Sequence, residues 1–218
     1  MEFASFIAVD YASGGRLVPT FIKGGAAMRR TLFAATCLLA LSPFMGQVSS
    51  ASDLTGIPPK TVADYIHAVI EADRTFYTVH VVERLQKHGG AEAAENWRSK
   101  QNVLPLPAQF LAEASDLASK TGTRVRYRLI SLWPINPQNG PDSETEKKGL
   151  EEVHQHPERA VTNSVKDGNQ HYFQVIYADY AVAQACVGCH NAHPRSPKND
   201  FKMNDVMGGL VIEIPVGE

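Results

Sequence analysis

The chain has 218 residues, of which 44% are hydrophobic and 20% charged, so it can bury a core and does not belong to a disordered class. Its 21 Lys and Arg residues against 23 Asp and Glu residues give a formal net charge of -2 and a sequence pI of about 6.4. Nucleic-acid binding needs a basic face that releases counterions, so this balance excludes nucleic acid as a general partner. Three cysteines are too few for a disulfide-built scaffold, so cysteine chemistry must come from the close pair Cys186 and Cys189.

Residues 28–51 have the order of a secretory signal peptide. Two arginines follow Met28, an apolar run of about a dozen residues comes next, and small residues end the segment at Ala51. The apolar run is too short to span a bilayer comfortably, so we expect a cleaved signal and no stable membrane span afterwards. Cys37 lies inside the apolar run, which argues against cleavage as a lipoprotein.

Residues 1–27 resemble neither a signal peptide nor a domain, and we interpret them as an extension upstream of the true start at Met28. Residues 52–218 are then predicted to form one secreted or periplasmic domain. All 8 histidines lie within it.

The first half of this domain is predicted to be helical. One long helix is expected from Thr61 to Gln86, ended by the Gly89-Gly90 pair. A short helical turn over 91–100, a proline-rich connector over 104–107 and a second helix over 108–120 follow. The stripe that defines the long helix recurs at helical spacing and consists of Ile66, Val69, Ile70, Asp73, Tyr77, His80, Val81 and Arg84.

After Gly122 the pattern changes to a period of two. Residues 124–129 alternate charged and apolar side chains, as a half-buried strand does. A turn-rich stretch over 133–142 leads into a charged helix over 143–155, and two more strands are expected over 170–177 and 209–216. The sequence therefore predicts an α+β fold with a long N-terminal helix and flanking helices.

The segment Cys186-Val187-Gly188-Cys189-His190 lies between the last two predicted strands. Two thiols separated by two residues can add to the two vinyl groups of one haem, and the next histidine is then held as an axial ligand of the iron. A secretory signal is consistent with this chemistry, because c-type haem is attached outside the cytoplasmic membrane. The pattern predicts one covalent haem c, bound by Cys186, Cys189 and His190.

Three other kinds of site could use the same residues. A zinc site could be formed by the two cysteines with His190 and His193, but the neighbouring Cys189 and His190 would strain a tetrahedral shell. A thioredoxin-like redox pair would need Cys186 at a helix N-terminus after a strand, which the flanking residues do not suggest. A structural disulfide between Cys186 and Cys189 is the third alternative.

At these residues the chain resembles the haem-c-attached PAS-like domain family, long described as a domain of unknown function. The resemblance is carried by the segments 186–202, 205–209, 128–131, 136–142 and 104–110, and it covers essentially all of 52–218. It implies a PAS-like antiparallel sheet packed with helices, one haem c, and a sensing or electron-transfer role. Members occur as small secreted haem proteins and as input modules of sensor kinases. Ile135 departs from the pattern, because members commonly have an arginine before Asn-Pro.

The sixth iron ligand is open at this point. Some members of that family use a cysteine there, but Cys37 belongs to the predicted signal. We favour His80, which lies on the stripe of the long helix, over His67, which is more than three turns away. Met203 and Met207 are further candidates, and an open position is the other alternative.

Polar residues near the predicted haem are also candidates. Arg128 is expected to pair with a propionate and His193 to bond a propionate or its own loop, whereas Arg126 is assigned to a solvated face. His154 and His156 are assigned to a solvated helix end rather than to a metal site.

Three functions compete for such a haem. Sensing of redox state or of a small gaseous ligand would need a partner, such as a sensor kinase, to relay the change. Electron transfer would need six strong ligands and a redox partner protein, and His80 as a ligand would favour it. A peroxidase-like enzyme would need an acid-base residue at an open distal site, and the sequence shows no motif for one.

Overall fold

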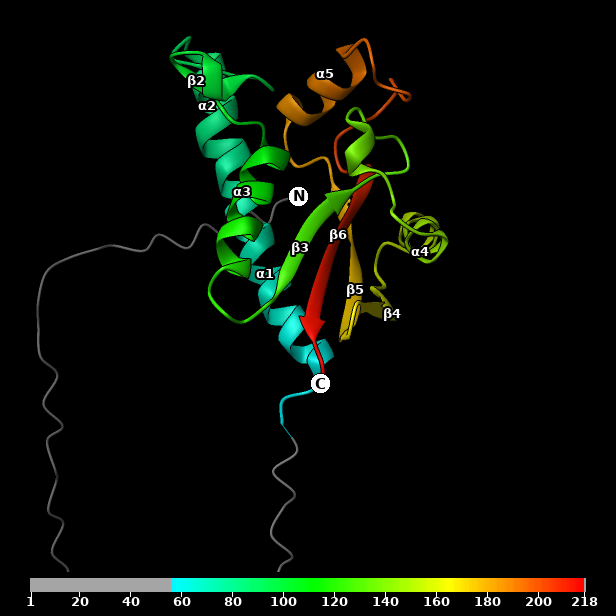
Figure 1. The fold of residues 1–218 in the computed structure, drawn as a ribbon. Coiled ribbons are helices and arrows are strands. Elements are labelled where there is room, and N and C mark those ends of the chain that lie inside the picture. Colours follow the sequence, from blue (N-terminus) through cyan, green and yellow to red (C-terminus); the bar gives the residue numbers. More distant parts are fainter. Residues whose placement is uncertain (1–55, 218) are drawn as a thin grey trace, which may run out of the picture. The chain divides into compact units, whose positions relative to one another are not determined.

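The computed structural model describes residues 56–217, so the predicted upstream extension and signal peptide lie outside the described residues. The described part is an antiparallel sheet flanked by helices, which confirms the predicted α+β class (Figure 1). The strands β3 (Arg126–Ile130), β4 (Val161–Asp167), β5 (Gln170–Tyr180) and β6 (Val206–Pro215) lie in the order β3-β6-β5-β4. Within 56–217, no helix combines the length and the apolar character that crossing a membrane requires.

A single helical rod forms the N-terminal part of the fold, as predicted. It consists of α1 (Pro59–Phe76), the π-helical segment η1 (Tyr77–Glu83) and α2 (Arg84–Lys87). Proline fits the first turn of α1 because its missing N–H would have no partner there. The rod ends before Gly89, whose φ of +68° is a conformation that glycine adopts without strain.

Three further helices are α3 (Pro107–Ser119), α4 (Glu144–Gln155) and α5 (Gln184–Ala192). The predicted turn over 91–100 contains the strand β1 (Glu92–Ala93) and the 3₁₀ turn η2 (Trp97–Ser99). The strand β2 (Val103–Leu104) pairs with β1 in parallel, and the 3₁₀ turn η3 (Pro137–Asn139) follows β3. Each of the longer predicted helices is therefore confirmed, with helix α5 added at the cysteine segment.

Helices cover both faces of the four-stranded sheet. On one face, side chains of α1 and α3 pack on alternate residues of β5 and β6, and the centre of this core includes Ile70, Leu111, Val175 and Ile212. On the other face, α4 packs on the intervening residues of the same strands. Because helices cover both faces, consecutive residues of β5 and β6 are buried, and the centres of both strands are largely apolar in sequence.

Helix α5 stands at one end of the sheet, in the connection from β5 to β6. It lies across from α2 and β2, at the end of the molecule opposite the C-terminus of β6 (Figure 1). A small apolar cluster of Ala181, Phe201 and Met207, joined by Trp133, Cys186 and Val187, fixes α5 to the sheet. The sheet and the helical rod thus hold the cysteine segment from two sides.

Gly208 is expected to tolerate no side chain. A Cβ atom built there would lie 2.2 Å from the backbone oxygen of Ile130 on the neighbouring strand β3. Since a backbone carbonyl cannot rotate away, Gly208→Ala should lower the free energy of unfolding by about 3 kcal/mol.

The matched control for this prediction is Gly188→Ala, in the exposed part of α5, where a Cβ atom would meet nothing within 4 Å. It should be neutral or stabilising by up to ~1 kcal/mol, because alanine favours a helix over glycine. Urea unfolding of both variants measures the difference. Equal stability of the two would contradict the close approach of β3 and β6 at Gly208.

Candidate functional site

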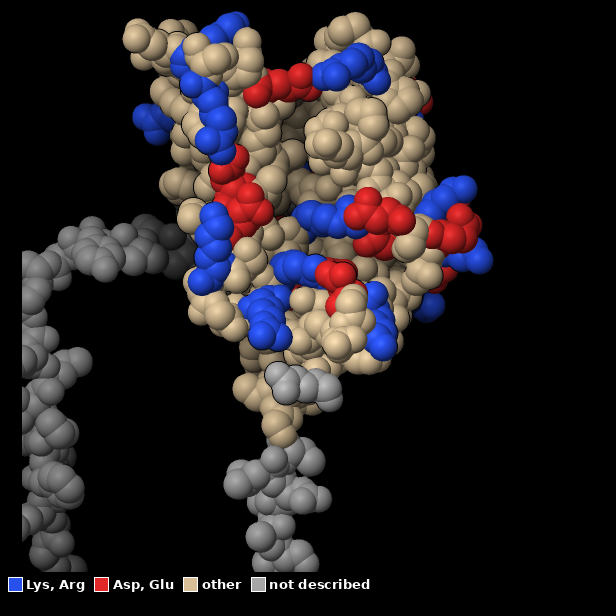
Figure 2. All heavy atoms as spheres, in the orientation of Figure 1, with Lys and Arg blue, Asp and Glu red and all other residues tan. Residues whose placement is uncertain are grey.

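A cavity of about 770 Å³ lies between the helical rod and α5. Figure 2 shows a recess at this end of the molecule, between the two halves that the rod and α5 form. Its volume is within the range of roughly 300–1,000 Å³ that is typical of cofactor sites. The walls combine the rod, the end of β3 with the loop that follows it, the segment around Glu95, and α5.

The π-helical segment η1 determines which face of the rod meets this cavity. Arg74, Thr78, Val82 and Gln86 line it at intervals of four residues. A wider helical turn brings residues four apart into closer register than an α-helix does, and such segments recur at functional sites. Thr78 is 1% exposed, and its hydroxyl donates a hydrogen bond to the carbonyl of Arg74 at 2.7 Å. This face is therefore fixed and buried rather than frayed.

Helix α5 brings the cysteine motif to the opposite side of the cavity. Cys186, Cys189 and His190 all line the cavity, because positions three and four apart share one helix face. Both cysteines are free thiols. Burial raises the pKa of each thiol, so both are protonated at neutral pH.

The ring of His190 is held in an apolar environment. It lies edge-on to Phe201 with the ring centroids 5.9 Å apart, and its Nδ1 atom is buried without a hydrogen-bond partner. Burial lowers the pKa of this imidazole, and the nearby charges of His193 and Arg74 lower it further. His190 is therefore neutral at neutral pH, which is the form that binds a metal.

His193 and Arg195 line the outer part of the cavity beside Glu95. Nη2 of Arg195 lies 2.7 and 2.8 Å from the two carboxylate oxygens of Glu95, and Nε2 of His193 lies 4.0 Å from that carboxylate. The Nδ1 atom of His193 accepts a hydrogen bond from the backbone N–H of Arg195 at 3.2 Å. His193 was predicted to bond a haem propionate or its own loop. In the structure it lines the cavity and forms a hydrogen bond within its own loop.

A buried ion pair lines the same cavity. Nη2 of Arg74 lies 2.9 and 3.0 Å from the two carboxylate oxygens of Asp179 at the end of β5. Burial raises the pKa of Asp179, and the charge of Arg74 opposes that change. Neither Arg74 nor Asp179 is among the site residues predicted from the sequence. The only signal for Asp179 was a charged residue directly after the apolar run Val175–Ala178.

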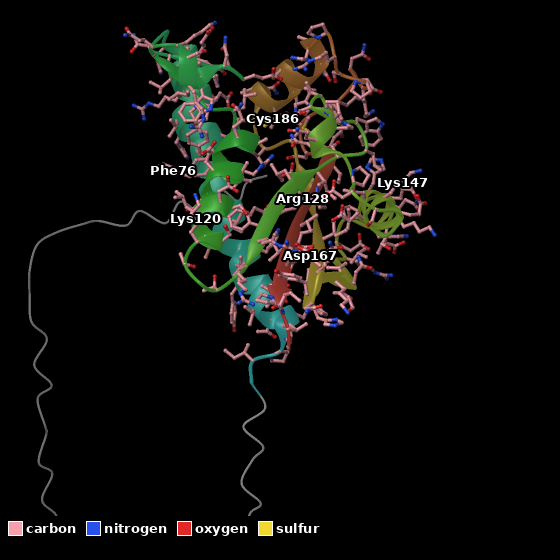
Figure 3. All side chains as sticks on the ribbon, viewed as in Figure 1. Phe76, Lys120, Arg128, Lys147, Asp167 and Cys186 are labelled. Atoms are coloured by element: carbon pink, nitrogen blue, oxygen red, sulfur yellow. The ribbon has the colours of Figure 1, made fainter. Side chains whose placement is uncertain are left out.

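Arg128, which was expected to pair with a propionate, is not among the residues that line the cavity and forms ion pairs instead. It belongs to β3, and Figure 3 labels it below Cys186. Its Nη2 atom lies 2.7 and 2.6 Å from the carboxylate oxygens of Glu146 and 2.7 Å from Asp142. The alternation of charged and apolar residues in β3 puts Arg128 on the charged face of the strand. In the structure this face packs against α4, which carries Glu146.

Arg126, on the same strand, was assigned to a solvated face, and its side chain is 37% exposed. It pairs with Asp167 and Glu213 and lies over the ring of Tyr172 at 4.1 Å. His154 and His156 are both exposed, and no three His, Cys, Asp or Glu side chains within 56–217 are arranged to hold a metal ion.

His80 lies outside the cavity lining, so its position does not suit the expected role as sixth ligand. It is exposed, and its ring packs at 5.0 Å on Phe76, which is 62% exposed on the outer side of the rod (Figure 3). The face of the rod that meets the cavity runs through Thr78 and Val82 instead.

The other ligand candidates are placed as follows. His67 stacks on Tyr177 with the ring centroids 3.9 Å apart and lines a separate, smaller pocket. Met207 lines the cavity but packs in the cluster that fixes α5 to the sheet, whereas Met203 is not among the lining residues.

One structural feature agrees with a thioredoxin-like redox pair at Cys186 and Cys189, and one does not. Contrary to the sequence-based argument, Cys186 does lie in the first turn of a helix that follows a strand. However, burial raises the pKa of its thiol, whereas a redox-active thiol of that class has a lowered pKa.

The residues present fit a haem. Two free thiols and a neutral imidazole with an unpartnered buried nitrogen converge on a cavity of cofactor size, with apolar walls from Val82, Leu129 and Ile130. Thioether attachment would use Cys186 and Cys189, and axial ligation would use His190.

The whole cavity lies within a region that is similar to known proteins. A family model described as Tll0287-like matches residues 58–215. One solved structure, described as the crystal structure of the cyanobacterial heme-protein Tll0287, is 18% identical, and the match covers 74% of this chain and 99% of that chain with a TM-score of 0.45. The search of curated proteins gives no match.

Proposed function

The chain belongs to the Tll0287-like family, and on that premise we propose that it is a haem protein that carries one haem c in the cavity between the rod and α5. The observation that carries the proposal is that Cys186, Cys189 and His190 line one cavity of about 770 Å³. The bound haem would supply an iron that changes redox state or ligand. The proposal extends to this chain the haem that the description of the solved structure, a cyanobacterial heme-protein, names for that protein.

Each residue of the motif has a separate task in this proposal. Cys186 and Cys189 attach the cofactor from consecutive turns of α5, which fixes its orientation relative to the helix. His190 supplies the axial nitrogen, and Phe201 against its ring limits rotation of the imidazole. Apolar residues of β3 exclude water from one side of the cavity, since burial is one of the factors that set a haem's potential.

Of the roles open to such a haem, we propose sensing of redox state or of a small ligand ahead of electron transfer. Electron transfer was favoured by His80 as a sixth ligand, and His80 is exposed away from the cavity. We place the protein in the periplasm or outside the cell, after removal of residues 28–51, with a redox partner or a sensor kinase as the receiver of its signal.

Intact mass under denaturing conditions tests the covalent cofactor. The chain is produced in a host that attaches c-type haem, and the expected mass is that of residues 52–218 plus one haem. Cys186→Ala with Cys189→Ala should lose the haem in denaturant, while each single variant should retain one thioether bond and a weaker attachment. A mass without haem, or one lower by two hydrogens, would contradict the proposal and favour a disulfide.

A further inference from the structure

We propose that a row of four aromatic rings carries single electrons between the iron of the bound haem and the surface of α4. The row starts at His190, continues through Phe201 and Trp133, and ends at His154. The partner class is a one-electron donor or acceptor, such as the metal centre of a redox protein, that approaches His154. The inference rests on the proposed function, because it requires a haem that His190 ligates.

Neighbouring rings of the row are in edge contact. The ring centroids of His190 and Phe201 are 5.9 Å apart, and those of Phe201 and Trp133 are also 5.9 Å apart. The ring centroid of Trp133 lies 5.1 Å from that of His154. The ring planes meet at 88°, 75° and 73°, the edge-to-face arrangement that aromatic pairs prefer at roughly 4.5–7 Å. An electron tunnels faster through side chains in contact than across an empty gap, so the row is a continuous path from the ligating imidazole.

Hydrogen bonds hold the two inner residues of the row in place. Asn191 of α5 donates from Nδ2 to the carbonyl of Phe201 at 2.9 Å, and its Oδ1 accepts the backbone N–H of Phe201 at 3.0 Å. The backbone N–H of Trp133 donates to Oγ of Ser131 at 3.0 Å, and that hydroxyl donates to the carbonyl of Met207 on β6 at 2.7 Å. Phe201 is therefore fixed to the helix that carries the haem motif, and Trp133 is fixed to the sheet.

The row leads from the buried site to solvent. Phe201 is 3% exposed, Trp133 is half-buried, and His154 is exposed in the last turn of α4. Trp133 belongs to the loop after β3, which lies between α5 and α4 (Figure 1). Of the four residues, only His190 lines the cavity. The path therefore passes through the packed side chains behind α5 and leaves the molecule away from the recess between the rod and α5.

The iron and the partner alone balance the transfer. In one direction, one electron leaves ferrous iron, which becomes ferric, and the acceptor is reduced by one electron. No bond forms or breaks and no proton moves, so none of the four residues has to change its protonation state. The rings are the medium through which the electron tunnels and are not themselves oxidised. A haem that senses redox state must exchange electrons with its surroundings, and the row supplies a defined point of entry at His154.

The test uses the haem-loaded protein with a ruthenium bipyridine complex coordinated to a surface histidine. Singly labelled proteins are separated by chromatography, and peptide masses identify the labelled residue. A laser pulse with an external quencher oxidises the ruthenium, and absorption then follows the rate at which the ruthenium takes one electron from the ferrous haem. A label on His154 reports on the row. A label on His156, which is exposed two residues further along and lies 3.9 Å from Glu158, is the matched control.

Three variants make the result specific. Trp133→Leu removes one ring and keeps an apolar side chain, so the rate from the label on His154 should fall several-fold, and the rate from His156 should change much less. Phe201→Leu interrupts the row at the next ring and should slow the same transfer, which gives a result even if Trp133→Leu fails to fold. The same substitution at the other tryptophan, Trp97→Leu in η2, should leave both rates unchanged. The reduction potential of each variant is also measured, because it separates a change of driving force from a change of path.

Two results would overturn the inference while leaving the haem in place. An unchanged rate from His154 in Trp133→Leu and Phe201→Leu would show that the electron takes another route, such as the recess between the rod and α5. An equal fall in the rates from His154 and His156 would show that the variants act on the haem itself and not on the row. In both cases an intact mass that includes one haem would keep the proposed function, and only a mass without haem would remove it.

Discussion

Replacing His190 by alanine is expected to change the absorption spectrum of the ferric haem protein, whereas replacing His80 by alanine is expected to leave it unchanged. His190 lines the cavity between Cys189 and the apolar contact with Phe201, and burial keeps its imidazole neutral by lowering its pKa. His80 is exposed and packs on Phe76 outside the cavity. Each variant removes one of the two histidine side chains that were predicted from the sequence to bind the iron.

The measurement is made on the fraction of each variant that carries haem. In His190→Ala, added imidazole should restore a spectrum close to the original, because it supplies the missing nitrogen ligand to the space that the side chain left. An unaltered spectrum in His190→Ala would exclude this histidine as the axial ligand. An altered spectrum in His80→Ala would show that the rod rotates when haem is bound, so that η1 presents a different face.

The cofactor motif could be predicted from sequence because its geometry is local. Cys186, Cys189 and His190 lie within five consecutive residues, and one helix of ordinary geometry brings them to one face. The resemblance to a family of haem proteins, read from segments along the whole domain, is confirmed by the match over residues 58–215. Long elements with a clear period, such as α3, α4 and β5, were likewise found close to their true limits.

The face of the rod that meets the cavity could not be predicted from a 3.6-residue period. Val69 of the predicted stripe lies in the regular helix α1 and is 62% exposed, so the stripe was already off the buried face before the π-helical segment, in which Thr78 is buried. The π-helical segment changes the register after Phe76, and no residue in its sequence signals such a turn. His80 lay on the same stripe, and in the structure it is exposed and is not among the residues that line the cavity.

Interactions between residues far apart in the chain were the second feature that could not be predicted from the sequence. Arg74 and Asp179 are 105 positions apart in the chain, and only the packing of the rod against β5 brings them together. Strand β4 was missed because it is an edge strand whose inward positions include the polar Asn163 between Val161 and Val165, which interrupts the apolar pattern. Its partner β5 supplies the pairing that the sequence of β4 alone does not reveal.

Replacing Glu146 by alanine is expected to cause the largest loss of stability outside the cavity. Glu146 is 4% exposed and accepts hydrogen bonds from Arg128, from Gln174 at 3.0 Å and from the backbone N–H of Asp142 at 2.8 Å. Removing one partner of a buried ion pair costs about 3–5 kcal/mol. Arg128 retains Asp142 and partial exposure, so we expect a loss of about 3 kcal/mol, at the low end of that range.

The matched control is Glu144→Ala, an exposed residue in the first turn of the same helix, which should change stability by about 0.5 kcal/mol or less. Urea unfolding of the haem-loaded variants measures both losses, and Arg128→Met combined with Glu146→Ala completes a double-mutant cycle. Because Arg128 and Glu146 are in direct contact, the double variant should cost less than the sum of the single variants. Additive losses would mean that Arg128 is not held by α4, and its guanidinium would then be free to reach a haem propionate after all.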